Sequence, residues 1–210
     1  MYLSTIVSAL VQLAVFTLIP FIVYVITRRR VRGYWGYIGV KAAPAGALAA
    51  GAVFGLVTAG LMLWLYSAPG LRQLMVDPST QTGRLNALLD EAGVLAWLYT
   101  AVIQALITTA LAEEIFFRGF VAKRLIAWRG FAVGNIAQAL LFGALHLALL
   151  LGTNAPLTLA RWLLVLLIPT VQGWVVAWLN ERHGNGSVAP GWAAHATANL
   201  VTFIAVPLLW

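Results

Sequence analysis

The sequence contains no cysteine, and only 9% of its 210 residues are charged. The first absence excludes disulfide bonds, thiolate metal sites and cysteine nucleophiles. The second excludes an ordinary soluble domain, in which about 25% of the residues are charged. Because 62% of the residues are hydrophobic, we interpret residues 1–210 as a single domain that lies in a membrane.

Acidic residues are also scarce: six stand against thirteen lysines and arginines, which gives a net charge of +7. A basic balance can indicate nucleic-acid binding, but these basic residues form no stripe interleaved with aromatic residues. They occur in short segments between apolar runs, which is the positive-inside pattern of membrane proteins. We therefore expect the lipid bilayer, and no nucleic acid, around this protein.

Six apolar segments are long enough for a spanning helix, which needs about 20 residues. They predict an all-α, polytopic transmembrane helix bundle and cover residues 3–27, 42–67, 93–121, 131–151, 157–180 and 188–209. The first segment lacks the features of a cleavable signal peptide, so we interpret it as a retained helix. Between two spans, residues 68–91 mix leucines with polar residues and predict a short interfacial helix.

The second segment carries a stripe of small residues spaced four apart: Ala47, Gly51, Gly55 and Ala59. Such a stripe lets two helix backbones approach closely in a membrane. We interpret it as a packing surface.

The basic residues divide the loops into two groups. Most lie in residues 28–41, 118–130 and 181–187, whereas the opposite loops carry only Arg72 and Arg84. The positive-inside rule therefore places the basic loops in the cytoplasm and both termini outside. We expect a multi-pass protein of a prokaryotic plasma membrane.

Two adjacent carboxylates, Glu113 and Glu114, lie inside an apolar segment. A charged side chain within the bilayer costs about 2.5–3.5 kcal/mol even on insertion scales. Arg118 follows Glu114 by four residues and should lie on the same helix face. An interfacial ion pair would explain Glu114 but leaves Glu113, rotated by about 100°, without a partner.

Two further segments carry polar residues on one helix face. Phe142 and His146 are four residues apart, and so are His195 and Asn199. Hydrogen bonding between helices would explain Asn199 alone. Such hydrogen bonding is a poorer explanation for two histidines that occur together with two glutamates. We therefore expect the helices that carry these residues to form one site.

The depths of these residues agree only in part. If the third span ends near Lys123, Glu113 lies about 15 Å from the cytoplasmic end, close to the about 12 Å of His195. His146, counted from Gly130, lies about 24 Å deep on the same scale. The active site is therefore expected nearer the cytoplasmic side, with His146 fitting least well.

Three motifs occur in order within residues 93–205: Glu113-Glu114-x-x-x-Arg118, Phe142-x-x-x-His146 and His195-x-x-x-Asn199. Together they resemble the motifs of the CPBP intramembrane proteases. That family comprises the Ras-converting type CAAX endopeptidases and the bacterial Abi-like and bacteriocin-immunity proteins. The resemblance implies an endopeptidase that hydrolyses a peptide or protein substrate, prenylated or otherwise anchored in the membrane.

The resemblance also implies roles for the motif residues. Glu113 and His146 would activate a water molecule as general base and partner, and His195 and Asn199 would donate hydrogen bonds to the oxyanion. A cytoplasm-facing cavity would admit the peptide and the water. The supporting residues would be Glu114, Arg118 and Phe142.

A divalent metal such as zinc is the alternative cofactor, with Glu113, His146 and His195 as its ligands. The sequence has no His-Glu-x-x-His helix, and asparagine is not among the usual zinc ligands. We therefore favour a glutamic-type peptidase without a cofactor over a metal-dependent one.

Two other functions stay open. Glu113, His146 and His195 could form the proton relay of a transporter, although the chain shows no internal repeat. The protein could also be a non-catalytic membrane immunity or scaffold protein.

Overall fold

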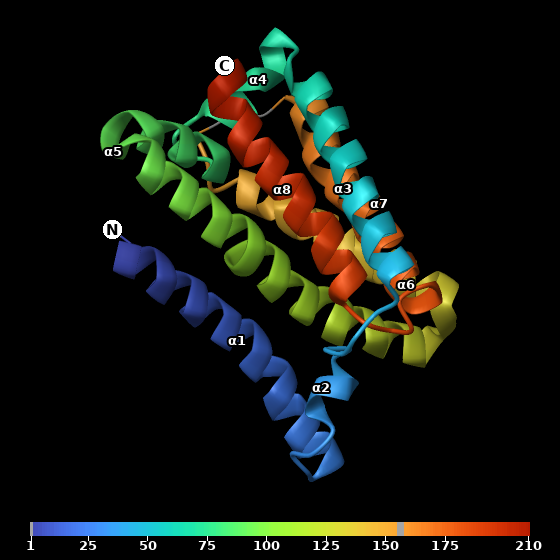
Figure 1. Cartoon of the computed structure of the whole chain (residues 1–210). Helices are drawn as coiled ribbons and strands as arrows, with labels where there is room; N and C mark the ends of the chain where they lie inside the picture. The colour runs from blue at the N-terminus through green and yellow to red at the C-terminus, as the bar shows by residue number, and fades with distance from the viewer. Residues whose placement is uncertain (1, 155–157) are drawn as a thin grey trace.

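A computed structural model describes residues 2–154 and 158–210, and this part of the chain contains helices and no strand (Figure 1). The elements in chain order are α1 (Tyr2–Arg28), α2 (Tyr34–Tyr37), α3 (Ala45–Tyr66), α4 (Pro69–Val76), α5 (Gln81–Ile103), the π-helices η1 (Gln104–Leu111) and η2 (Glu114–Ala122), α6 (Lys123–Leu150), α7 (Leu159–Arg182) and α8 (Ala189–Leu209). The all-α, polytopic fold class is confirmed.

Among the described residues, five helices are long and apolar enough to cross a membrane. One of them, Gln81–Leu150, is a run of 70 residues that contains two of the six predicted spans, 93–121 and 131–151. The backbone leaves helical geometry inside this run at Gly93 and Gly130. The predicted start of the fifth span at residue 157 lies outside the described residues.

The helix that carries the acidic pair runs further than predicted. It continues through Lys123 to Gly130, where φ is 78° and the chain turns back. A side chain at Gly134 would overlap the backbone of Ile126, so the two arms of the turn are in close contact. Gly130 supplies the positive φ that this reversal requires.

The position of Gly130 removes the mismatch in depth. Glu113 lies 17 residues before Gly130 and His146 lies 16 residues after it. At 1.5 Å per residue both are roughly 25 Å from the turn. The two side chains therefore reach the same level of the bundle on neighbouring, opposed helix arms.

The small-residue stripe of α3 packs against α8, which confirms its interpretation as a packing surface. A Cβ atom on Gly51 would overlap the carbonyl oxygen of Pro190, and one on Gly55 would overlap that of Ala194. Close approach of the two backbones is thus possible only with glycine at these positions. The contact fixes α8 immediately beside His195.

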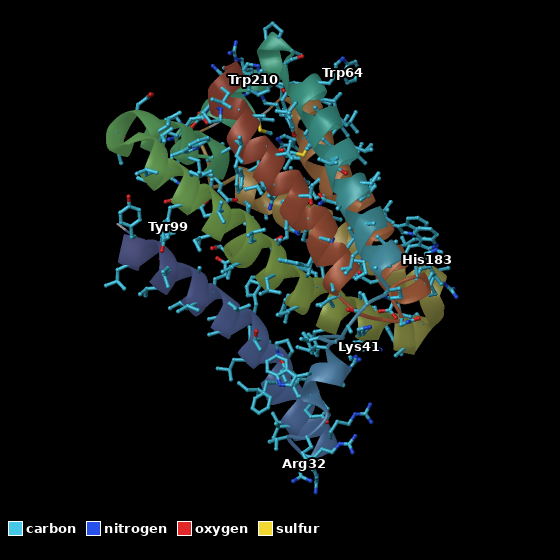
Figure 2. All side chains as sticks on the ribbon, viewed as in Figure 1. Arg32, Lys41, Trp64, Tyr99, His183 and Trp210 are labelled. Atoms are coloured by element: carbon cyan, nitrogen blue, oxygen red, sulfur yellow. The ribbon has the colours of Figure 1, made fainter. Side chains whose placement is uncertain are left out.

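The predicted interfacial segment forms α4 and the first part of α5, up to Gly93. Thr80 caps α5 by accepting a hydrogen bond from the backbone of Gly83 at 3.1 Å. This end of the molecule carries Trp64 and Trp210, whereas Arg32 and Lys41 lie at the opposite end (Figure 2). We call these the α4 end and the basic end.

Candidate functional site

The helix around the acidic pair is widened into two π-helical segments, η1 and η2, with Glu113 between them. The hydroxyls of Thr108 and Thr109 bond to the carbonyls of Ile103 and Gln104, five residues back, at 3.4 and 2.8 Å. The sequence predicted a regular α-helix here. Short π-helical segments occur often at functional sites, and these turn the residues around Glu113 out of regular helical phase.

Glu114 and Arg118 form the predicted ion pair, with Nη1 of Arg118 3.1 Å from Oε1 of Glu114. Both side chains are almost fully buried, at 0% and 1% exposure. The guanidinium also lies 4.0 Å above the ring of Phe142, a cation–π contact. Gly173 on α7 leaves room for it, since a Cβ there would lie 3.2 Å from Nη2 of Arg118.

His195 lies between the two carboxylates. Its Nδ1 is 3.4 Å from Oε1 of Glu114, and its Nε2 is 4.0 Å from Oε2 of Glu113. A carboxylate can only accept, so the hydrogen on Nδ1 is donated to Glu114. This contact joins α8 to the helix of the acidic pair and orients the ring of His195.

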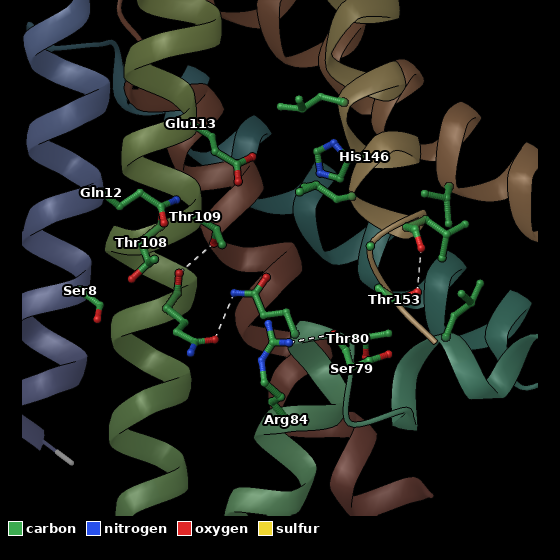
Figure 3. Close-up of a pocket in the computed structure, with 18 of the residues that line it drawn as sticks. Ser8, Gln12, Ser79, Thr80, Arg84, Thr108, Thr109, Glu113, His146 and Thr153 are labelled. Atoms are coloured by element: carbon green, nitrogen blue, oxygen red, sulfur yellow. Dashed lines mark hydrogen bonds between the residues drawn. The ribbon is translucent and has the colours of Figure 1, made fainter. Parts of the chain in front are cut away.

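Glu113 is placed differently from its neighbour. Its side chain is 18% exposed, and its Oε2 makes no hydrogen bond to any residue that the structure describes. It faces His146 across a cavity (Figure 3). The two glutamates thus face different surroundings, Glu114 an ion pair and Glu113 a cavity, and the roles assigned to them stay predictions.

His146 is fixed by its own helix. Its Nδ1 lies 2.9 Å from the carbonyl oxygen of Phe142, and the two rings meet edge to face at 4.5 Å. Because a carbonyl only accepts, Nδ1 carries the hydrogen, and the neutral ring has its free lone pair on Nε2. His146 can thus accept a proton through Nε2.

Asn199 reaches the site through a threonine that sequence reasoning missed. Its Nδ2 donates to Oγ1 of Thr109 at 2.7 Å, and that hydroxyl donates to the carbonyl of Gln104. Thr109 therefore sets the direction of the amide group. No motif marks Thr109, because its partner lies 90 residues away in the sequence.

One cavity of about 210 Å³ brings the four predicted catalytic residues together: its lining includes Glu113, His146, His195 and Asn199. Gln172 of α7, also missed from the sequence, lines the same cavity. The predicted convergence of three helices on one site is thus present in the geometry.

A second, larger cavity of about 1110 Å³ shares Glu113 and His146 with the first. It continues past Gln12 of α1 to Ser79 and Arg84 near the α4 end (Figure 3). The wide part of the space around Glu113 therefore leads away from the basic end.

Two buried polar residues of α6, the helix that carries His146, bond to the backbone of α7. Asn135 donates to the carbonyl of Trp174 at 3.0 Å, and Gln138 donates to that of Gly173 at 2.9 Å. Both side chains are fully buried between α6 and α7. They hold these two helices together and do not line either cavity around Glu113.

The choice between a metal-free and a metal-dependent site stays a prediction. Among residues 2–154 and 158–210, no three His, Asp or Glu side chains come together as ligands of one ion would. Glu114 is already engaged by Arg118 and His195.

Comparison with protein families gives a match to the model described as type II CAAX prenyl endopeptidase Rce1-like, over residues 94–201. Comparison with curated proteins and with solved structures gives no match. The matched segment spans just over half of the chain and contains all three motifs. Together with its apolar helices, it identifies the chain as an integral membrane protein of the Rce1-like family of type II CAAX prenyl endopeptidases.

Proposed function

We propose that this protein is an intramembrane endopeptidase that hydrolyses a peptide bond with a water molecule activated by Glu113 and His146. The observation that carries the proposal is the shared cavity: of the two adjacent glutamates only Glu113 lines it, together with His146, His195 and Asn199, and its Oε2 has no hydrogen-bond partner among the described residues. Glu114 is buried against Arg118, and no other aspartate or glutamate among the described residues lines this cavity.

The chemistry begins with proton removal from water. Glu113 takes a proton and the hydroxide attacks the scissile carbonyl carbon, with Nε2 of His146 accepting a hydrogen bond from the same water. The protonated Glu113 then returns the proton to the leaving nitrogen as the C–N bond breaks. The reaction consumes one water and needs no cofactor.

The carbonyl oxygen becomes negative during the attack and needs donors. Asn199 has a second N–H beyond the one given to Thr109. His195, when protonated, donates from Nδ1 to Glu114 and from Nε2 into the cavity. Such preorganised donors typically contribute a factor of about 10²–10³ each.

The substrate is a peptide or protein held at the membrane, through a prenyl group or another anchor. The larger cavity supports this, because its walls carry exposed apolar side chains of α1 and α6, among them Val11 and Leu149. An extended chain lying there would pass Glu113 with its lipid-soluble part among apolar residues.

The membrane side of the site stays a prediction. The sequence predicted a cytoplasm-facing cavity, but the wide part of the cavity leads to the α4 end. With the basic loops in the cytoplasm, that part would open at the outer face. A prokaryotic plasma membrane likewise stays a prediction.

The test uses purified protein in detergent with two fluorogenic peptides, one ending in a farnesylated Cys-Ala-Ala-Leu sequence and one anchored by an acyl chain. We expect cleavage by the wild type that persists in the presence of EDTA. Glu113→Gln should lower kcat by about 10²–10⁴-fold, as should His146→Ala, while both variants elute as folded protein.

Glu91→Gln is the matched control, because Glu91 is exposed and lies outside both cavities. Normal cleavage by Glu113→Gln would contradict the proposal. Loss of cleavage with EDTA and its return with zinc would instead establish a metal-dependent enzyme.

A further inference from the structure

A third cavity, of about 320 Å³, lies at the basic end among α1, α2, the helix of the acidic pair and the start of α8. Its floor includes Ile115 and Val188, which are each only 4% exposed. Its mouth includes Trp35 and Val40, which are 57% and 38% exposed. The cavity therefore has a buried floor and opens at the surface of the bundle.

The lining is almost entirely apolar. Apart from Thr17 and Lys41, it consists of aliphatic and tryptophan side chains. The indole N–H of Trp192 is already donated to the carbonyl of Leu106 at 2.8 Å. Water in such a hole would find few polar partners, whereas a hydrocarbon chain would be well solvated.

The mouth of this cavity carries one positively charged side chain, that of Lys41. Among the described residues of the lining, Lys41 alone is charged, and it is exposed. No carboxylate lines the cavity, and nearby Glu181 is paired with Lys123 at 2.5 Å. The preceding loop adds Arg28, Arg29, Arg30 and Arg32 at the same end of the molecule.

The mouth is held in place by the body of the protein. Oγ of Ser187 donates to the carbonyl of Lys41 at 2.6 Å, and the backbone of Val188 donates to Gly39 at 2.9 Å. The lysine is therefore tied to the start of α8 and not carried by a free loop.

We propose that this cavity binds one acyl chain of an anionic phospholipid, whose phosphate pairs with Lys41. The apolar hole takes the chain, Trp35 lies at the depth of the headgroups as interfacial tryptophans do, and the basic loop supplies the attraction for negative charge. This cavity shares no lining residue with the cavity that contains Glu113, His146, His195 and Asn199, so the site does not depend on the proposed catalysis.

The experiment uses the purified full chain in detergent with phosphatidylglycerol or phosphatidylcholine, each carrying a diazirine on one acyl chain. After irradiation, labelled residues are mapped by mass spectrometry. We expect labelling at lining residues such as Leu13 and Leu111, stronger with phosphatidylglycerol. Lys41→Gln should reduce this preference about fivefold, the factor that corresponds to about 1 kcal/mol for one lysine at a charged membrane surface.

Ala189→Phe should fill the cavity and abolish labelling there with both lipids, whereas the matched Ala49→Phe, on the exposed face of α3, should leave it unchanged. If Ala189→Phe aggregates on size exclusion, Thr17→Trp fills the same cavity from α1. Equal labelling by the two lipids, or labelling that survives a folded cavity-filling variant, would overturn the proposal.

Discussion

Glu114 and Arg118 are ionic groups that the fold removes almost completely from solvent. Each has few partners: Glu114 contacts Arg118 and His195, and Arg118 has in addition the ring of Phe142. Loss of one member of such a pair leaves the other charge buried and uncompensated. We therefore expect the folded protein to lose stability when either residue of the pair is replaced, because the remaining charge stays buried without a partner.

We expect Glu114→Gln to destabilise the protein by about 3–5 kcal/mol, which corresponds to a fall in Tm of roughly 6–20 °C for a chain of this size. Thermal unfolding in one detergent measures this. The double variant Glu114→Gln with Arg118→Met should recover part of the loss, because it removes the unpaired charge. A single variant as stable as the wild type would show that Arg118 has another counter-charge.

Thr109 acts on catalysis through Asn199. Thr109→Val keeps the shape of the side chain but removes the acceptor of the Asn199 amide. A misplaced donor lowers the rate of the chemical step, so we expect kcat to fall by about ten- to hundredfold with little change in KM. Thr109→Ser, which restores the hydroxyl, should restore kcat.

Thr58→Val is the control for Thr109, because Thr58 is equally buried but bonds only to its own helix at Phe54. Its kcat should equal that of the wild type. If Thr109→Ser stays as slow as Thr109→Val, the threonine has a packing role and not a positioning one.

Among side-chain contacts, the sequence predicted those between residues that are close together on one helix. The Glu114–Arg118 pair follows from a spacing of four on one helix, and the structure confirms it. The Asn199–Thr109 bond joins residues far apart in the sequence and carries no spacing signal. The roles of Glu113, His146, His195 and Asn199 stay predictions that the variants above test.

The element that decides the site is the contact between α3 and α8. Gly55→Leu should push the backbone of α8 away at Ala194, next to His195, since even a Cβ would overlap it. We expect overpacking to cost about 1–3 kcal/mol or more and cleavage to fall with it. Thermal unfolding and the fluorogenic assay report the two effects.

Gly60→Leu is the matched control, since a Cβ at Gly60 meets no atom within 4 Å. It should behave as the wild type in both measurements. Equal damage by the two substitutions would mean that α3 is sensitive to any large side chain and not specifically at its contact with α8.

The sequence predicted where most of the long helices lie, but it did not predict where they end or where their geometry departs from a regular α-helix. The turn at Gly130 and the widened segments η1 and η2 are local changes of backbone geometry within an apolar segment. Hydropathy reports only how apolar a segment is. It therefore placed the spans but predicted an end near Lys123, seven residues too early.

At the scale of the whole molecule, the question is which end faces the cytoplasm. The absence of native cysteine makes each introduced cysteine the only thiol. Gly36→Cys at the basic end and Gly70→Cys at the α4 end are suitable, because both glycines are exposed and a Cβ meets nothing within 4 Å.

A membrane-impermeant maleimide applied to intact cells should label Gly70→Cys and leave Gly36→Cys unlabelled, as the positive-inside rule predicts. Permeabilised cells, in which both should react, provide the control. The reverse pattern would place the basic end outside and the wide part of the cavity on the cytoplasmic side.

The sequence by itself determined the class of protein: few charges and long apolar segments require a helical membrane protein, and three spaced motifs indicate the family. These properties follow from composition and from contacts within one helix. Only the tertiary structure decided that Glu113 and His146 meet at one level, that Thr109 orients Asn199, and that the cavity widens toward the α4 end. Each of these depends on helices whose relative height and rotation are set by packing at Gly51 and Gly55 and by the turn at Gly130.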